Sequence, residues 1–412
     1  MVVKNLHVRG TWFAFPPLKT NAPLVVNANA VRKAYRTSKR PAYVFNRDSV
    51  RLGVQNVLFC LALKQQPINV GLIGFGFAGR TFHAPVIRAV PGLQLTTILQ
   101  RKGNDAANAY PDVRIVRTLE ELLAFDSVQL VVIATPNVSH FDLARQCLLA
   151  RFHVVIDKPF ATTYAEAAEL VALAEKCGRL LSVYHSRRFD GDFKTVRNLV
   201  ASEALGRIVL YESHYDRYRP QLRAGAWREQ AGAGNGVWFD LGPHLIDQAL
   251  ALFGSPEAVS ADVRIERDGA AVDDAFDVTL LYPRLRVQLR GTMLACKPAP
   301  HFLIHGTKGC YVKYGLDPQE NALKRGELPG GSAWGKEPQE AWGTLSRMEV
   351  DELTEQAIPT EPGDYRGYYE NVRDAILGKV ALAVTPQGAL SVMRVLELAQ
   401  QSSLERRVIQ YT

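Results

Sequence analysis

Three polar side chains interrupt an otherwise apolar helical segment in the second half of the chain. In AGAGNGVWFDLGPHLIDQALALFG, residues 231–254, Asp240, His244 and Asp247 are spaced i, i+4 and i+7. In a helix this spacing puts all three on one face. A carboxylate beside an imidazole suits proton transfer near neutral pH, because the unperturbed histidine pKa is about 6.5. The structural alternative is that Asp240 caps a helix with Pro243 in its first turn, and that His244 is a buried core imidazole.

A glycine-rich turn supplies a second chemical signal. INVGLI is an apolar run of strand length, and GFGFAG follows it as G-x-G-x-x-G at the start of a helical pattern. The first two glycines permit a tight turn and close approach of a pyrophosphate, and the third lets the helix pack on the strand. The helix N-terminus attracts the phosphate charge. We therefore expect a dinucleotide site, with turn contacts from Gly74, Gly76, Phe77, Ala78 and Gly79.

Apolar strands alternate with helical patterns through the next hundred residues. LQLTTIL, VQLVVIA, HVVI and LLSVY are separated by helical stretches such as 137–150 and 162–177. This alternation indicates a parallel sheet with helices on both faces, whose ligands bind at the carboxyl ends of the strands. TPNVSH and DKPF follow two of these strands, and Lys158 should emerge beside the nicotinamide. Further predicted cofactor contacts are Thr135, Pro136, Asn137, His140, Asp157 and Arg188.

The residues after the second strand indicate which dinucleotide binds. A carboxylate about 20 residues past the glycines would bind the ribose 2′-OH of NAD. Here ILQRKGND places Gln100, Arg101 and Lys102 at that point, and Asp105 comes too late to substitute. A guanidinium and an ammonium suit a 2′-phosphate, so the sequence predicts NADP and makes NAD the less favoured cofactor. The alternative is that Arg101 and Lys102 are solvated loop cations.

The pattern changes in the second half of the body. GRIVLYESHYDRYRP reads as a long strand, and EAVSADVRIERD, DDAFDVTLLYP and LRVQLRGTML alternate apolar and polar residues between turns. This indicates a mainly antiparallel sheet with one half-solvated face, for which Thr279, Leu281 and Val287 are candidates. We therefore expect an α/β Rossmann domain over 68–187, with a doubly wound parallel sheet. An α+β substrate and oligomerisation domain over 188–412 follows, and its last helices pack back on the first domain.

The composition excludes several classes of function. The 412 residues are 47% hydrophobic and carry a net charge of +8, but residues 1–67 hold eleven Lys or Arg and one acid, which leaves the other 345 residues at −2. The body has no basic stripe interleaved with aromatics, so we predict no nucleic-acid partner. The apolar run VLFCLAL at 57–63 is too short to span a membrane. Five cysteines without C-x-x-C or zinc-finger spacing predict no metal site and a reducing, cytoplasmic location.

Residues 1–67 read as a basic extension that is unfolded or only locally ordered. They show no sustained helical or strand period and contain five prolines. Three interpretations are open: a disordered arm, a basic acid-poor targeting peptide, and upstream sequence translated from an early start codon. We favour the first or the third. Whether these residues belong to the mature protein is not decided by the sequence.

Several motifs together resemble one family. GLIGFGFAGRTFHAP, TPNVSH, DKPF, HSRRFD and GNGVWFDLGPHLIDQAL, in this order, are similar to the Gfo/Idh/MocA oxidoreductases, and within them to the NADP-dependent scyllo-inositol dehydrogenase branch. The resemblance covers Ile68 to about the C-terminus. It implies that the catalytic lysine of the family's E-K-P motif falls on Lys158, with Asp157 in place of the glutamate. The family's D-x-x-x-H pair falls on Asp240 and His244. Pairing of subunits through the C-terminal sheet is common in this family.

These observations predict an NAD(P)-dependent enzyme that acts on the CH–OH group of a cyclic polyol or sugar. Oxidation of a secondary alcohol needs a base for the hydroxyl proton, a donor that stabilises the developing alkoxide, and a hydride acceptor. We assign the base to His244 and the donor to Lys158, with Asp240 orienting one of them. The predicted catalytic residues are Lys158, Asp240 and His244, and the predicted substrate contacts are these three with His214 and Asp247. The rivals are a reductase of another carbonyl and a non-catalytic NADP-binding regulator.

Overall fold

The computed structural model describes residues 5–8, 11–14, 66–223, 225 and 229–412. By backbone contacts the chain divides into two units, Met1–Gln65 and Gln66–Thr412. In the first unit, β1 (Asn5–Val8) and β2 (Thr11–Ala14) form an antiparallel pair, so local order exists there. The rest of the predicted basic extension up to residue 65 lies outside the described residues.

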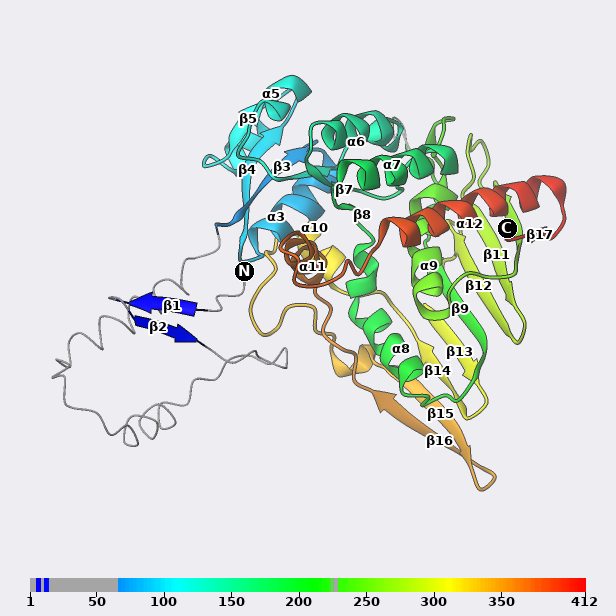
Figure 1. The fold of residues 1–412 in the computed structure, drawn as a ribbon. Coiled ribbons are helices and arrows are strands. Elements are labelled where there is room, and N and C mark those ends of the chain that lie inside the picture. The colour runs from blue at the N-terminus through cyan, green and yellow to red at the C-terminus, as the bar shows by residue number, and fades with distance from the viewer. Residues whose placement is uncertain (1–4, 9–10, 15–65, 224, 226–228) are drawn as a thin grey trace, which may run out of the picture. The chain divides into compact units, whose positions relative to one another are not determined.

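The first half of the second unit is built on a six-stranded parallel sheet (Figure 1). The strand order is β5-β4-β3-β6-β7-β8. The chain adds strands on one side of β3 up to β5 and then on the other side from β6, so the order reverses between β3 and β6. The strands are β3 (Ile68–Ile73), β4 (Leu93–Leu99), β5 (Arg114–Val116), β6 (Leu130–Ile133), β7 (His153–Ile156) and β8 (Leu181–Val183). These strands are apolar and buried, because helices cover both faces of a parallel sheet. The predicted doubly wound Rossmann fold is confirmed.

Short and long helices connect these strands. A π-helical turn η1 (Gly79–His83) runs into α3 (Ala84–Arg88), and α6 (His140–Leu149) and α7 (Tyr164–Cys177) fill the helical stretches expected from the sequence. α7 begins with a capping box between Thr163 and Glu166. Sequence periodicity missed β5 and the short helices α4 (Asp105–Ala109) and α5 (Leu119–Leu123), each too short for a period to show.

The second half contains a nine-stranded, mainly antiparallel sheet, as predicted (Figure 1). β9 runs parallel to β12 and antiparallel to β13. The sheet order is β16-β15-β14-β13-β9-β12-β11-β10-β17. The strands are β9 (Ile208–Asp216), β10 (Ala258–Arg264), β11 (Ala275–Tyr282), β12 (Leu285–Thr292), β13 (Phe302–Gly306), β14 (Gly309–Lys313), β15 (Gly343–Glu349), β16 (Glu352–Ile358) and β17 (Ile409–Gln410).

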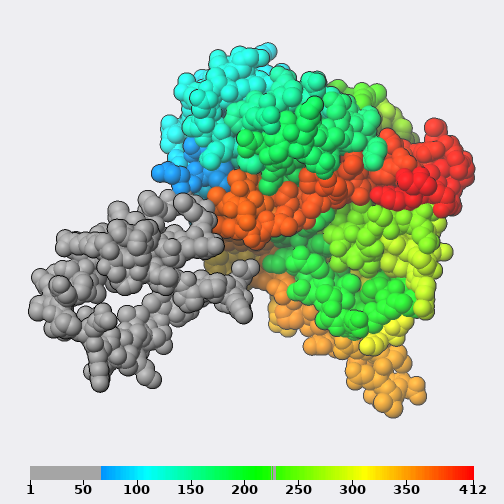
Figure 2. Space-filling model, viewed as in Figure 1, coloured from blue at the N-terminus to red at the C-terminus, as the bar shows by residue number. Residues whose placement is uncertain are grey.

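Two long helices cover one face of this sheet. α9 (Val237–Phe253) contacts β9, β11 and β12, and α12 (Pro386–Glu405) contacts β10. α12 also contacts α7 and β8, while α11 (Arg366–Ile376) contacts α3, so both helices reach the first sheet (Figures 1 and 2). The boundary that the sequence predicts at 187/188 lies inside this second unit and stays a prediction. Shorter helices are η2 (Asn137–Ser139), η3 (Ser186–Phe189), α8 (Gly191–Ala201), α10 (Gln319–Lys324) and η5 (Gln339–Ala341).

Strand alternation separates a core face from an outer face of the large sheet. Val287 is fully buried on the core face, where Trp238 of α9 stacks against Phe276 with ring centroids 4.9 Å apart. Thr279 and Leu281 alternate with the buried residues of β11 and belong to the outer face. The prediction that Val287 faces outward is therefore wrong, since its strand register points it at the helices.

No helix in the described residues is long and apolar enough to cross a membrane. The four cysteines of the described residues, Cys147, Cys177, Cys296 and Cys310, are free thiols. The same residues hold no cluster of His, Cys, Asp and Glu that could bind a metal.

Candidate active site

The glycine turn lies where the sequence places it, between β3 and η1. Gly74 has a φ of +96°, and a Cβ there would lie 2.7 Å from the carbonyl oxygen of Ala134. A Cβ on Gly79 would lie 2.1 Å from the carbonyl oxygen of Gly74, so both positions require glycine. Gly76 faces open space, with no heavy atom within 4 Å of an added Cβ. Such a turn fits a dinucleotide pyrophosphate, because backbone can approach the ligand closely at Gly76.

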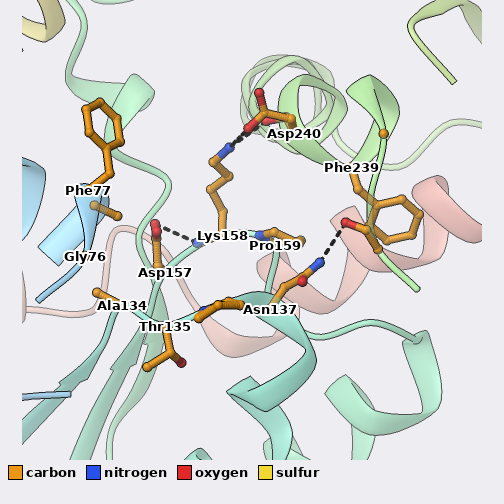
Figure 3. A pocket seen from close by; sticks show the side chains of 14 residues that line it. Gly76, Phe77, Ala134, Thr135, Asn137, Asp157, Lys158, Pro159, Phe239 and Asp240 are labelled. Carbon is orange, nitrogen blue, oxygen red and sulfur yellow. Dashed lines mark hydrogen bonds and ion pairs between the residues drawn. The ribbon is translucent and has the colours of Figure 1, made fainter. Parts of the chain in front are cut away.

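A pocket opens beside this turn (Figure 3). Asn137 forms part of its wall through a hydrogen bond from its Nδ2 to the carbonyl oxygen of Gly234, 2.7 Å away. Phe77 is 53% exposed and stacks edge-on against Phe82. The lining residues are Gly76, Phe77, Ala78, Ala134, Thr135, Pro136, Asn137, Asp157, Lys158, Pro159, Gly234, Gly236, Phe239 and Asp240. The pocket thus brings seven of the thirteen predicted cofactor contacts together with two of the three predicted catalytic residues.

Lys158 and Asp240 face each other across this pocket (Figure 3). The Nζ of Lys158 donates to the backbone oxygen of Asp240 at 2.6 Å and to its Oδ1 at 3.0 Å. Arg217, just past the end of β9, places Nη1 3.6 Å from the other carboxylate oxygen. The Asp240 carboxylate therefore lies between two basic side chains. These contacts hold the amino group of Lys158 at the pocket.

The first turn of α9 positions Asp240 without using it as a cap. The helix begins after Gly236, and the carboxylate of Asp273 accepts from the backbone N of Trp238 at 2.6 Å. Pro243 lies inside the helix, past the first turn. The structural alternative for Asp240 is therefore wrong: Gly236 is the N-cap residue and Asp273 accepts from the helix N-terminus, while Asp240 contacts Lys158 and Arg217.

His244 lies one turn after Asp240 and is 7% exposed. Its Nδ1 is buried without a hydrogen-bond partner, and the residue is not among those that line the pocket. Burial, followed by the positive charges of Lys158 and Arg187, holds the pKa of His244 well below its usual value. The ring is therefore neutral at physiological pH and able to accept a proton.

Asp157 stands where the E-K-P pattern has a glutamate, and its contacts show what the shorter side chain does. Its Oδ1 accepts from the backbone N of Lys158 at 2.9 Å and lies 3.6 Å from Nε2 of His83. Burial alone would raise the pKa of Asp157, but His83, Lys158 and His140 hold it below its usual value. The shorter carboxylate therefore supports the lysine loop from within and stays ionised.

Asp247 and Arg188 are brought together, but away from the pocket lining. Asp247 is fully buried, and its two oxygens accept from Nε and Nη2 of Arg188, each at 2.7 Å. His185 lies beside them with its Nε2 3.9 Å from Asp247. The geometry does not support the predicted substrate contact of Asp247 or the predicted cofactor contact of Arg188, because each satisfies the other.

His214 lies on the outer face of the large sheet. Its Nε2 is 3.2 Å from Glu212 and its Nδ1 4.0 Å from Asp216, both two residues away on the same face of β9. Tyr215 points to the opposite face, where its hydroxyl accepts from Arg187 at 2.6 Å. The structure therefore does not bring His214 to Lys158, and Arg217, just past the end of β9, lies beside Asp240 instead.

Arg117 fixes the loop that is predicted to bind the 2′-phosphate. Arg101 and Lys102 are exposed in a bend after β4. Nη1 of Arg117 donates to the backbone oxygens of Gln100 at 2.8 Å and Gly103 at 2.7 Å, and its Nη2 donates to Asn104 at 2.9 Å. These hydrogen bonds fix the backbone of the loop, and Arg101 and Lys102 lie on its surface.

Sequence reasoning missed three residues around this site: His83, His185 and Arg187. Arg187 is buried and pairs with Asp190 and Glu320. His83 was visible in the glycine-turn motif as part of RTFHAP, but its contact with Asp157 joins segments more than seventy residues apart. Such contacts have no local signal in a single sequence.

Comparison with known proteins now identifies the family. Residues 68–185 match the oxidoreductase family's NAD-binding Rossmann fold, and residues 197–411 match the C-terminal alpha/beta domain of the same family, Gfo/Idh/MocA. The chain belongs to the Gfo/Idh/MocA oxidoreductase family. It is accordingly an NAD(P)-dependent oxidoreductase that acts on CH–OH groups of a small molecule.

Individual relatives cover most of the body. The uncharacterized oxidoreductase YdgJ of Escherichia coli is 45% identical over 342 residues, which is 83% of this chain and 98% of YdgJ. The scyllo-inositol 2-dehydrogenase (NADP⁺) IolW of Bacillus subtilis is 37% identical over 346 residues, 84% of this chain and 96% of IolW. Among solved structures, the oxidoreductase YvaA of Bacillus subtilis has a TM-score of 0.82 at 36% identity and covers 84% of this chain and 99% of its own.

Proposed function

We propose that the protein oxidises a secondary alcohol of a cyclic polyol or sugar with NADP, or reduces the matching ketone. The observation that carries this proposal is the contact of Lys158 with Asp240 in the pocket beside the glycine turn, one helical turn from a neutral His244. The scyllo-inositol dehydrogenase IolW, and a D-glucoside 3-dehydrogenase of Escherichia coli at 26% identity over 49% of this chain, support the substrate class.

In this proposal each side chain has a distinct role in alcohol oxidation. When bound, the nicotinamide would supply the acceptor for the hydride of the carbinol carbon. The ammonium of Lys158 donates a hydrogen bond to the substrate oxygen and stabilises the alkoxide that develops there. His244 accepts the hydroxyl proton, because its neutral ring has a free lone pair. Asp240 holds the Lys158 side chain in place through two hydrogen bonds.

The NADP preference rests on the loop after β4. Arg101 and Lys102 offer two cations at the point where an NAD-binding chain carries an acid, and Arg117 fixes the backbone between them and α4. The NADP-dependent relative IolW agrees with this choice. Titration of the protein with NADP and with NAD tests it, and equal affinities would contradict it.

The test of the reaction is a panel of inositols, hexoses and pentoses assayed for NADPH formation. We expect turnover with at least one cyclic polyol or sugar. A non-catalytic regulator would be favoured instead if NADP binds tightly but no member of the panel is oxidised and no ketone is reduced in the reverse direction.

We also propose that subunits pair through the outer face of the large sheet. Within the described residues α9 and α12 lie on the core face, while polar and charged side chains such as Gln288, Arg290 and Asp277 alternate on the other face. Light scattering of the purified protein tests this, and a monomer at assay concentration would contradict it. The cytoplasmic location stays a prediction from cysteine usage.

A further inference from the structure

One buried histidine joins the cofactor loop to the lysine loop. His140, the first residue of α6, is 1% exposed. Its Nε2 lies 2.9 Å from the backbone oxygen of Thr135, which follows β6, and its Nδ1 lies 2.8 Å from the backbone oxygen of Pro159, which follows Lys158. A single ring therefore bridges two loops. Thr135 of one loop and Pro159 of the other both line the pocket (Figure 3).

The two contacts place a strict demand on the ring's protonation. A backbone carbonyl oxygen only accepts hydrogen bonds, and a neutral imidazole has one N–H and one bare lone pair. A neutral ring would satisfy one carbonyl and direct its lone pair at the other from less than 3 Å. Only an imidazolium, with a proton on each nitrogen, donates to both. The contacts of His140 therefore fit the charged form.

The surroundings pull in both directions. Burial, the largest effect, holds the pKa of His140 below its usual value, although Asp157 and the two backbone oxygens act in the opposite direction. The pKa of Asp157 is held below its usual value, and its other neighbours are Lys158 and His83. Against burial stand the two close carbonyl contacts and the nearby carboxylate, which together are the arrangement that stabilises a buried imidazolium.

We propose that His140 is a positioning residue, held as an imidazolium, that ties the Thr135 loop to the Lys158 loop and so fixes the lysine against Asp240. This inference rests on the proposed role of Lys158. His140 does not line the pocket and acts through the backbone of Pro159. As the pH rises through the pKa of His140, one of the two hydrogen bonds is lost, and the lysine loop loses its fixed distance from the cofactor loop.

Neutron diffraction from crystals grown above pH 6.5 tests the protonation in the native protein. That value is the ordinary histidine pKa, so an unperturbed ring would be neutral under these conditions. We expect hydrogen on both Nδ1 and Nε2 of His140. Hydrogen on only one ring nitrogen would overturn the proposal, whatever any variant shows.

The positioning role is tested by His140→Gln, which keeps one amide donor but cannot carry a charge. We expect kcat to fall by between about 10-fold and 10²-fold, the range that misplacement of a catalytic group by about 1 Å produces, with the KM of the alcohol little changed. The loss of rate that the proposal predicts for the native enzyme at alkaline pH should be absent from this variant. An unchanged kcat and pH profile would overturn the proposal.

His153→Gln is the matched control. His153 begins β7, at the opposite end of the strand from Lys158, and its Nδ1 accepts from the backbone N of Leu180 at 3.0 Å. We expect this variant to retain the native rate and pH profile. If the enzyme turns over no substrate while His140 is still an imidazolium, the proposed function is refuted but the protonation is not. The two failures are therefore distinguishable.

Discussion

Removal of the Lys158 ammonium should abolish turnover while leaving the fold and cofactor binding nearly intact. Lys158→Met keeps the length of the aliphatic stem and removes only the charge and its two hydrogen bonds to Asp240. A positioned acid–base or charge-stabilising group contributes about 10² to 10⁴ in rate. At 1.36 kcal/mol for each factor of ten, this corresponds to an activation barrier raised by about 3 to 5 kcal/mol.

The cost to stability should be much smaller. The side chains of Lys158 and Asp240 are 13% and 22% exposed, so solvent screens part of their attraction. After the substitution Arg217 still lies 3.6 Å from the Asp240 carboxylate, which leaves no isolated buried charge. We expect the free energy of unfolding to fall by about 1 kcal/mol or less.

Three measurements separate these effects. NADPH formation with the best substrate of the panel gives the rate, titration of protein fluorescence gives the NADP dissociation constant, and urea unfolding gives the stability. Lys176→Met, an exposed lysine near the end of α7, is the control and should behave as the native enzyme does. A near-native rate in Lys158→Met, or a loss of NADP affinity as large as the loss of rate, would refute the catalytic reasoning.

Four further predictions concern other parts of the molecule. Replacing Arg101 and Lys102 by serine should weaken NADP binding by at least about 10-fold, since a hydrogen bond to a charged group contributes about 1.5–3 kcal/mol, and should leave NAD binding unchanged in the same titration. Because the pKa of His244 is lowered by burial and nearby cations, the base is deprotonated above that pKa, so kcat for alcohol oxidation should not fall as the pH drops to 6.5 and should decline only well below it. Arg188→Met leaves a fully buried carboxylate unpaired and should lower the free energy of unfolding by about 3–5 kcal/mol in urea, with the substrate KM unchanged. A protein without residues 1–65 should keep its fold and turnover in circular dichroism and activity assays, because the relatives match the body over nearly their full length; loss of either would show that the extension contributes.

Much of the first domain could be predicted because its signals are local. Apolar runs of strand length, the glycine turn and the helical stretch from 162 to 177 are each complete within about twenty residues. The conformation at Gly74 and the close contact at Gly79 show why those positions hold glycine. β5 and α5 were missed, since three to five residues are too few to establish a period.

The candidate site was predictable only in part. The sequence alone determined that Asp240, His244 and Asp247 share a helix face and that Lys158 follows a buried strand. Only the tertiary structure decided what that face meets, because the helix passes from the pocket at Asp240 to the interior at Asp247, where Arg188 neutralises the carboxylate.

Strand register likewise determined which face of the sheet each β9 side chain occupies. Its side chains alternate between two faces, so a difference of one position sends His214 to the outer face and Tyr215 to the core. The composition of the strand does not say which face will meet the helices. That choice depends on packing against α9, more than twenty residues further along the chain, and it placed Arg217 rather than His214 beside Asp240.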